Sequence, residues 1–123
     1  MKYLFLIHAD VENPKTISES EGEALDRACL ANDEVLWERG YLLFAMRLQD
    51  DGYAATVQVQ NGELSLTSGP FSPTEAQLVG VFLISARDLN EALRLAARMP
   101  QARRGPIEVR SALKFGWPNT SAR

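Results

Sequence analysis

Six short segments of the chain have the apolar patterns typical of β-strands. Residues 55–60 and 63–67 alternate with period two on either side of Asn61-Gly62, which is the strongest short hairpin signal. Residues 79–86 form a continuous apolar run, which predicts a central strand. The other three predicted strands are residues 2–8, 41–48 and 107–113. We therefore expect a sheet together with one half-exposed hairpin.

The longest helical pattern covers residues 19–39. Ser18 and Ser20 each precede a glutamate by three residues, which gives two overlapping capping boxes, and Gly40 is a natural stop. The apolar face predicted for this helix consists of Leu25, Ala28, Cys29, Asn32 and Leu36. Cys29 lies on this face and no histidine lies nearby in the sequence, so we expect it to be a core thiol and not a nucleophile.

A second helix is predicted over residues 89–99. Asp88 supplies a cap at its start, and Pro100 ends it because the residue before a proline is pushed out of the helical region. The inward face predicted for this helix consists of Leu89, Ala92, Leu93, Ala96 and Ala97. Each predicted helix is therefore preceded and followed by a strand.

The order strand, helix, strand, hairpin, strand, helix, strand predicts an α+β fold. It is the ferredoxin-like split β-α-β pattern with an inserted β-hairpin. Two helices on one side leave the other face of a four-stranded sheet uncovered, and a second copy of the chain is a common solution. We therefore predict a homodimer, with one domain over residues 1–115 and a C-terminal tail over residues 116–123.

Composition narrows the function classes. The chain has 123 residues, of which 46% are hydrophobic and 24% charged, so it is globular and not disordered. The net charge of −3 argues against a nucleic-acid partner. Without an apolar run long enough for a bilayer or a signal peptide, we expect a soluble cytoplasmic protein with no membrane contact. The single histidine and single cysteine argue against a metal centre, and we expect no cofactor.

The charges are unevenly distributed along the chain. Residues 1–86 carry 5 basic and 13 acidic side chains, whereas residues 87–123 carry 8 basic and 3 acidic ones. The excess of basic residues is explained either by oppositely charged surfaces that meet in the fold, or by a basic pocket for an anionic ligand. Arg103 and Arg104 precede Gly105-Pro106, so we expect them on an exposed turn.

An ordered series of short motifs resembles the YCII-related family, and within it the branch named for an Asp-Gly-Pro-Phe (DGPF) motif. The motifs are Gly69-Pro70-Phe71, Leu89-Asn90-Glu91-Ala92-Leu93, Ala96-Ala97-Arg98-Met99-Pro100 and Ile107-Glu108-Val109-Arg110. This resemblance implies a dimeric α/β barrel with a His/Asp-centred site in the cleft of the sheet. Two acids usual in the motif are replaced, by Ser68 and Pro73, while Thr74 is retained.

The candidate catalytic pair is His8 with Asp10. Two residues apart in a strand, they would share one face, and a carboxylate can orient an imidazole for acid–base work. Alternatively, His8 is a partly buried strand-end residue bonded to a carbonyl, and Asp10 is a loop residue. The candidate substrate-binding residues are Arg47, Ser68, Pro70, Phe71 and Thr74. Arg47 interrupts an apolar segment and would bind a substrate carboxylate, pair with a nearby acid, or face water.

Two functions follow from these residues. The first is a cofactor-free acid/base enzyme of the isomerase or lyase type, acting on a small acidic or aromatic substrate. The alternative is a non-catalytic ligand-binding or regulatory interaction module that has lost the family's carboxylate at Ser68. A small-molecule ligand and a homodimeric partner are common to both functions.

Overall fold

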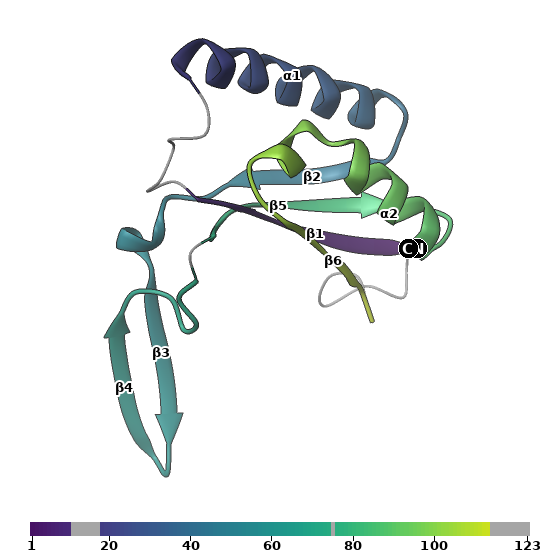
Figure 1. Ribbon diagram of the computed structural model, residues 1–123. Coiled ribbons are helices and arrows are strands. Elements are labelled where there is room, and N and C mark those ends of the chain that lie inside the picture. Colours follow the sequence, from purple (N-terminus) through teal and green to yellow (C-terminus); the bar gives the residue numbers. More distant parts are fainter. Residues whose placement is uncertain (11–17, 75, 114–123) are drawn as a thin grey trace.

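The computed structural model describes residues 1–10, 18–74 and 76–113 (Figure 1). The predicted tail over residues 116–123 lies outside these ranges. The strands and helices, in chain order, are β1 (Lys2–Ala9), α1 (Glu19–Glu38), β2 (Leu42–Arg47), β3 (Ala55–Gln60), β4 (Glu63–Ser68), β5 (Gln77–Ser85), α2 (Leu89–Arg98) and β6 (Ile107–Ser111). Two short 3₁₀ helices that the sequence did not predict are η1 (Asp51–Tyr53) and η2 (Pro100–Arg103).

The main sheet has four strands in the order β2-β5-β1-β6, and every neighbouring pair is antiparallel. Its two helices lie on one face (Figure 1). This arrangement confirms the α+β fold and is consistent with the ferredoxin-like pattern, because β1 and β2 are separated by β5. Strands β3 and β4 form a separate two-stranded sheet.

The two helices begin at the caps expected from the sequence. Ser18 is the N-cap of α1, and its hydroxyl accepts a hydrogen bond from the backbone N–H of Glu21 at 3.2 Å. Asp88 caps α2 by accepting from the backbone N–H of Glu91 at 2.8 Å. These bonds satisfy amide groups that have no partner in the first turn of a helix. Of the two candidate boxes at the start of α1, the one at Ser18 is therefore used.

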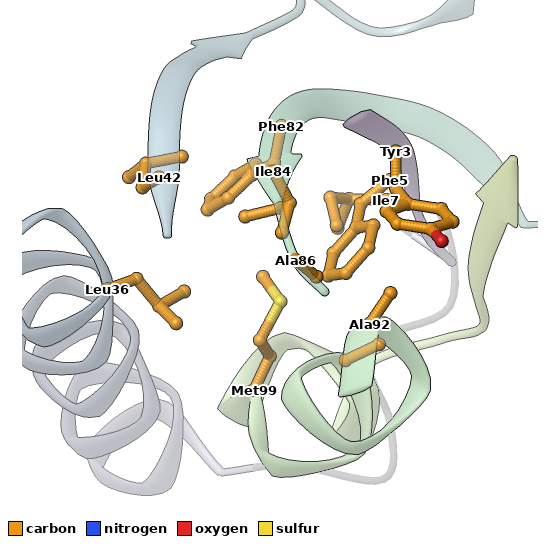
Figure 2. Close-up of a cluster of buried hydrophobic side chains, with 11 residues drawn as sticks. Tyr3, Phe5, Ile7, Leu36, Leu42, Phe82, Ile84, Ala86, Ala92 and Met99 are labelled. Carbon is orange, nitrogen blue, oxygen red and sulfur yellow. The ribbon is translucent and has the colours of Figure 1, made fainter. Parts of the chain in front are cut away.

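The core lies between the sheet and the helices. Alternate side chains of β1 and β5 point inward, where they meet α2 and the end of α1 (Figure 2). The buried residues of this cluster are Tyr3, Phe5, Ile7, Leu36, Leu42, Phe82, Ile84, Ala86, Ala92, Ala96 and Met99. Met99 ends α2 and points into the middle of the cluster (Figure 2). Period-two alternation therefore sets which face of each strand is buried.

The predicted inward face of α2 is partly wrong. Ala92 and Ala96 are buried as expected, but Leu89 and Leu93 are each nearly half exposed, and Ala97 is exposed too. The helix turns its small residues toward the sheet and brings Leu95 inward beside them. Small side chains allow a close approach of helix and sheet, so the longer leucines at the border remain on the surface.

The face of the sheet away from the helices is apolar over β1, β5 and β2 and uncovered within the described residues, while on β6 the same rows end in the ion pair of Arg110 with Glu108. Register places Leu4, Leu83 and Phe44 side by side in one row across three strands. The next row contains Leu6, Val81 and Met46. Phe44 and Met46 are 45% and 49% exposed. We call these two rows the outer apolar face.

Candidate functional site

A cavity of about 330 Å³ lies between α1 and the helix-facing side of the sheet. Residues 7–9 at the end of β1, Arg47 at the end of β2 and the first half of β5 line it on the sheet side. Residues of α1 and η2 line the opposite side. Its volume is at the low end of the range for small-molecule sites.

Backbone contacts hold the end of β1 at His8, one of the residues that line the cavity. The β1–β5 register shifts between Ile7 and His8, so the ladder is irregular at this point. The N–H of His8 donates to the Pro106 carbonyl at 3.0 Å. Gly105 lies so close to the His8 carbonyl that a Cβ at this position would overlap it. The sequence suggested only a turn at Gly105. The structure shows that the backbone of this glycine packs against the His8 carbonyl, which a side chain at this position would prevent.

The His8 ring has a nitrogen without a hydrogen-bond partner in the described part of the chain. This atom is Nδ1, and it is buried. A buried unsatisfied polar atom costs free energy, and a bound ligand or water would satisfy it. Asp10 does not line the cavity and does not bond to Nδ1, so any orienting effect would act elsewhere on the ring.

Gly80 opens space on the sheet side of the cavity. It lies in register between Ile7 and Arg47, on the same face of β5 as the buried Phe82. A side chain there would project between its neighbours, and its Cβ would approach the Met46 carbonyl to 3.2 Å. The missing side chain therefore contributes to the depth of the cavity beside the Arg47 guanidinium.

Arg47 is the last residue of β2 and lines the cavity from the edge of the sheet. Among residues 1–10, 18–74 and 76–113, no ion pair involves its guanidinium. An unpaired guanidinium beside a cavity can bind a carboxylate through two parallel hydrogen bonds. Of the alternatives open at the sequence level, pairing with a nearby acid is not observed in these ranges.

A polar stripe of α1 faces the cavity. Asp26, Cys29 and Asp33 are spaced three and four residues apart, so they lie on one side of the helix. Arg104 bonds to this stripe, with a 2.7 Å ion pair to Asp26 and a 2.9 Å hydrogen bond to the Gly22 carbonyl. The Nε2 group of Gln101 donates to Asp33 at 3.1 Å. These contacts fasten α1 to η2 across the cavity.

Cys29 is half-buried and lines the cavity, so the expected core position is wrong. Burial raises the pKa of its thiol, which Arg104 and Arg47 lower and the two stripe carboxylates raise further. Because burial dominates, the thiol stays protonated at neutral pH. The expectation that Cys29 is not a nucleophile therefore rests on burial and not on distance from the histidine, since His8 lines the same cavity.

Asp33 makes the stability of the protein depend on pH. Burial raises the pKa of this carboxyl, although the hydrogen bond from Gln101 opposes the shift. The folded protein therefore binds the proton more tightly than the unfolded chain, and ionised Asp33 disfavours folding at neutral pH. We expect Asp33→Asn to stabilise the protein at pH 7 by a few tenths to about 1 kcal/mol, with the gain disappearing below the unfolded-state pKa of about 4.

Urea denaturation of wild type and Asp33→Asn at pH 7 and at pH 3.5 measures this effect. Glu34→Gln is the matched control, because the neighbouring carboxyl is exposed and its loss should leave stability unchanged at both pH values. An equal gain from Asp33→Asn at both pH values would show that the buried charge is not its cause.

The predicted site residues separate into two groups. His8 and Arg47 line the cavity together. The residues of the Gly-Pro-Phe loop do not: Ser68 ends β4, Pro70 is half-buried, and Phe71 is 80% exposed. Thr74 is exposed, and its hydroxyl donates to the Ala76 carbonyl. The acids replaced at Ser68 and Pro73 therefore change no wall of the cavity.

Sequence reasoning missed the residues that α1 and η2 contribute. The helix was assigned a single apolar face, and the polar stripe at its border was not recognised. The signal for Arg104 was the excess of basic residues after residue 86. Arg104 is half-buried and paired with Asp26, so the expectation of an exposed turn is wrong for it, while Arg103 is exposed.

The described residues were considered for a metal site and for a membrane-spanning helix. No group of three or more His, Cys, Asp or Glu side chains in those residues is placed to hold a metal ion. Neither described helix is long and apolar enough to cross a bilayer.

Comparison with known proteins gives the family. The model of the YCII-related domain matches residues 1–116. An uncharacterized protein of Rhizobium meliloti (strain 1021) is 34% identical over 112 residues, which cover 89% of this chain and 90% of the relative. The family match includes the strands of the sheet and the residues that line the cavity, and the match to the relative covers about nine tenths of each of the two proteins. The chain belongs to the YCII-related family.

Proposed function

We propose that the protein binds a small organic anion in the cavity and transfers a proton to or from it at His8. The observation that carries this proposal is that His8 and Arg47 line the same cavity, with no ion pair to the Arg47 guanidinium within the described residues. Arg47 would hold the carboxylate, and His8 would act on a carbon or oxygen beyond it. An imidazole has an unperturbed pKa of about 6.5, which suits proton transfer in either direction near neutral pH.

The walls of the cavity favour an acid with an apolar body. Ile7, Val79 and Phe82 supply apolar surface on the sheet side, and Leu30 supplies it from α1. Of the other charged residues in the lining, Arg104 is paired with Asp26, and the Asp33 carboxyl accepts a hydrogen bond from Gln101. This pattern supports an isomerase or lyase type of reaction on a small acidic or aromatic substrate, with no cofactor taking part.

The functional unit that we propose is a homodimer joined through the outer apolar faces, as in a dimeric α/β barrel. Two apolar rows cross three strands, and within the described residues Phe44 and Met46 are exposed while the other four side chains are half-buried. Covering them with a second sheet at a spacing of about 10 Å removes that surface from water. A two-fold axis would make the contact self-complementary and closed.

Two finer assignments belong to the same proposal. Membership of the DGPF branch is supported by the loop at Gly69-Pro70-Phe71, where Gly69 has a φ of +98° that a side chain would strain. The cytoplasm is the compartment we propose, because the free thiol of Cys29 suits a reducing environment.

Ligand binding tests the proposal directly. Benzoate and pyruvate serve as probes, and the ring C–H signals of the single histidine report binding in NMR titrations. We expect one of the acids to shift these signals, and Arg47→Ala to weaken its binding about 10- to 100-fold, because a hydrogen bond to a charged group contributes about 1.5–3 kcal/mol.

Arg103→Ala is the matched control, because it removes an exposed guanidinium that does not line the cavity. Its affinity for the acid should equal that of wild type. Histidine signals that respond to neither acid, or equal affinity in the Arg47 variant, would contradict an anion site at this cavity.

A further inference from the structure

The hairpin of β3 and β4 has one apolar face that nothing in its own described chain covers. Register pairs Val57 with Leu66 and Val59 with Leu64, so the four side chains share one side. They are between 63% and 71% exposed. The pair between these two, Gln58 with Ser65, places polar side chains on the other side of the hairpin. We call this hairpin the arm.

One hydrogen bond joins the segment before the arm to the sheet, and two more close the base of the arm itself. The Asp51 N–H donates to Oε1 of Gln77, a buried side chain at the start of β5, at 2.9 Å. The Gly69 N–H donates to the Ala54 carbonyl at 2.8 Å, and the Thr56 hydroxyl donates to the Gly69 carbonyl at 2.9 Å. The arm therefore leaves the sheet in a defined direction.

That direction leads past the outer apolar face. Figure 1 shows the arm extending from one end of the sheet to the side opposite the helices. Its strands have six residues each, so the arm is about 20 Å long at about 3.3 Å per residue. Two packed sheets lie about 10 Å apart. A sheet stacked on the outer apolar face would thus occupy the space beside the arm, and the arm would reach beyond it.

We propose that each arm lays its apolar face on the other subunit of the homodimer. This inference rests on the proposed dimer and adds a second contact surface to it. A two-stranded hairpin is marginally stable alone. The four exposed apolar residues of the arm therefore indicate that this side of the arm packs against another protein surface. A second copy is that partner because the outer apolar face brings it alongside the arm. Two-fold symmetry then makes the two arm contacts reciprocal and closes the assembly.

Paired substitutions on the two sides of the arm test the contact. Val59→Thr with Leu64→Thr replaces one apolar rung, whereas Gln58→Thr with Ser65→Thr changes the neighbouring polar rung with the same new residues. We expect the first pair to raise the dimer dissociation constant at least about tenfold in sedimentation measurements, because two side chains per arm lose buried apolar contact. The second pair should change it by less than about twofold.

Intermolecular nuclear Overhauser effects separate this inference from the dimer itself. In mixed dimers of methyl-labelled and unlabelled protein, we expect contacts from the methyl groups of Val57 and Leu66 to the unlabelled subunit. Contacts from Leu83 but none from the arm would overturn the inference and leave the sheet dimer standing. Contacts from the arm alone would support the inference and contradict the sheet contact. A monomer at all concentrations would overturn both.

Discussion

We expect His8→Gln to lower the catalysed rate of proton exchange in a small 2-oxo acid by about 10²–10⁴-fold, the range typical of a general acid–base group. Glutamine has a similar size and keeps polar atoms, but it cannot gain or lose a proton near neutral pH. The readout is hydrogen–deuterium exchange at the carbon next to the keto group of pyruvate or phenylpyruvate in D₂O. This exchange reports proton transfer itself, whichever full reaction follows.

Asp10→Asn is the comparison variant. Asp10 follows β1 and does not line the cavity, so its loss should lower the rate by much less than loss of the imidazole. Circular dichroism and the urea midpoint show whether each variant is folded. Equal exchange rates in wild type and His8→Gln would remove the imidazole from the reaction. Binding of an acid without any catalysed exchange would instead support the non-catalytic ligand-binding module.

The second large effect concerns the outer apolar face. Leu83 lies at its centre, between Leu4 on β1 and Phe44 on β2. Leu83→Arg would bury an unpaired charge in each subunit and set two guanidinium groups near the two-fold axis. A buried unpaired charge costs about 3–5 kcal/mol. We therefore expect the dimer dissociation constant to rise at least about a thousandfold.

Sedimentation over a range of concentrations measures this constant. Leu93→Arg is the matched control, because it makes the same change at a residue of α2 that is 46% exposed on the other side of the molecule. It should leave the dimer intact. Dimers of unchanged affinity in the Leu83 variant would contradict a sheet-to-sheet contact, whatever the arms do.

Most elements of the fold were predictable because their signals are local. Helix α1 begins at Ser18, where the hydroxyl caps its first turn, and the hairpin turns at Asn61 and Gly62, which both have positive φ. The apolar segment over residues 2–8 predicted a strand, and Tyr3 and Phe5 of that strand are buried. Such signals depend on neighbours within four residues, so they can be read without knowing the tertiary contacts.

The candidate site was predictable only in part. His8 and Arg47 stood out because each is a polar residue at the end of an apolar segment. Asp26 and Arg104 are 78 residues apart in the sequence, and only the packing of η2 against α1 brings them to 2.7 Å. The Gly-Pro-Phe loop drew attention by its resemblance to a family motif, yet it does not line the cavity of its own subunit.

The sequence by itself determined the order of strands and helices, the caps, the hairpin turn and the family. The elements, caps and turn depend on local backbone preference and on the period of apolar residues, whereas the family was identified by its resemblance in an ordered series of short motifs. Only the tertiary structure decided that His8 and Arg47 share a cavity with a stripe of α1, and that Gly105 must lack a side chain beside the His8 carbonyl. It also showed that the outer sheet face and the arm both remain uncovered. Each of these depends on distances between segments far apart in the chain, which local periodicity does not encode.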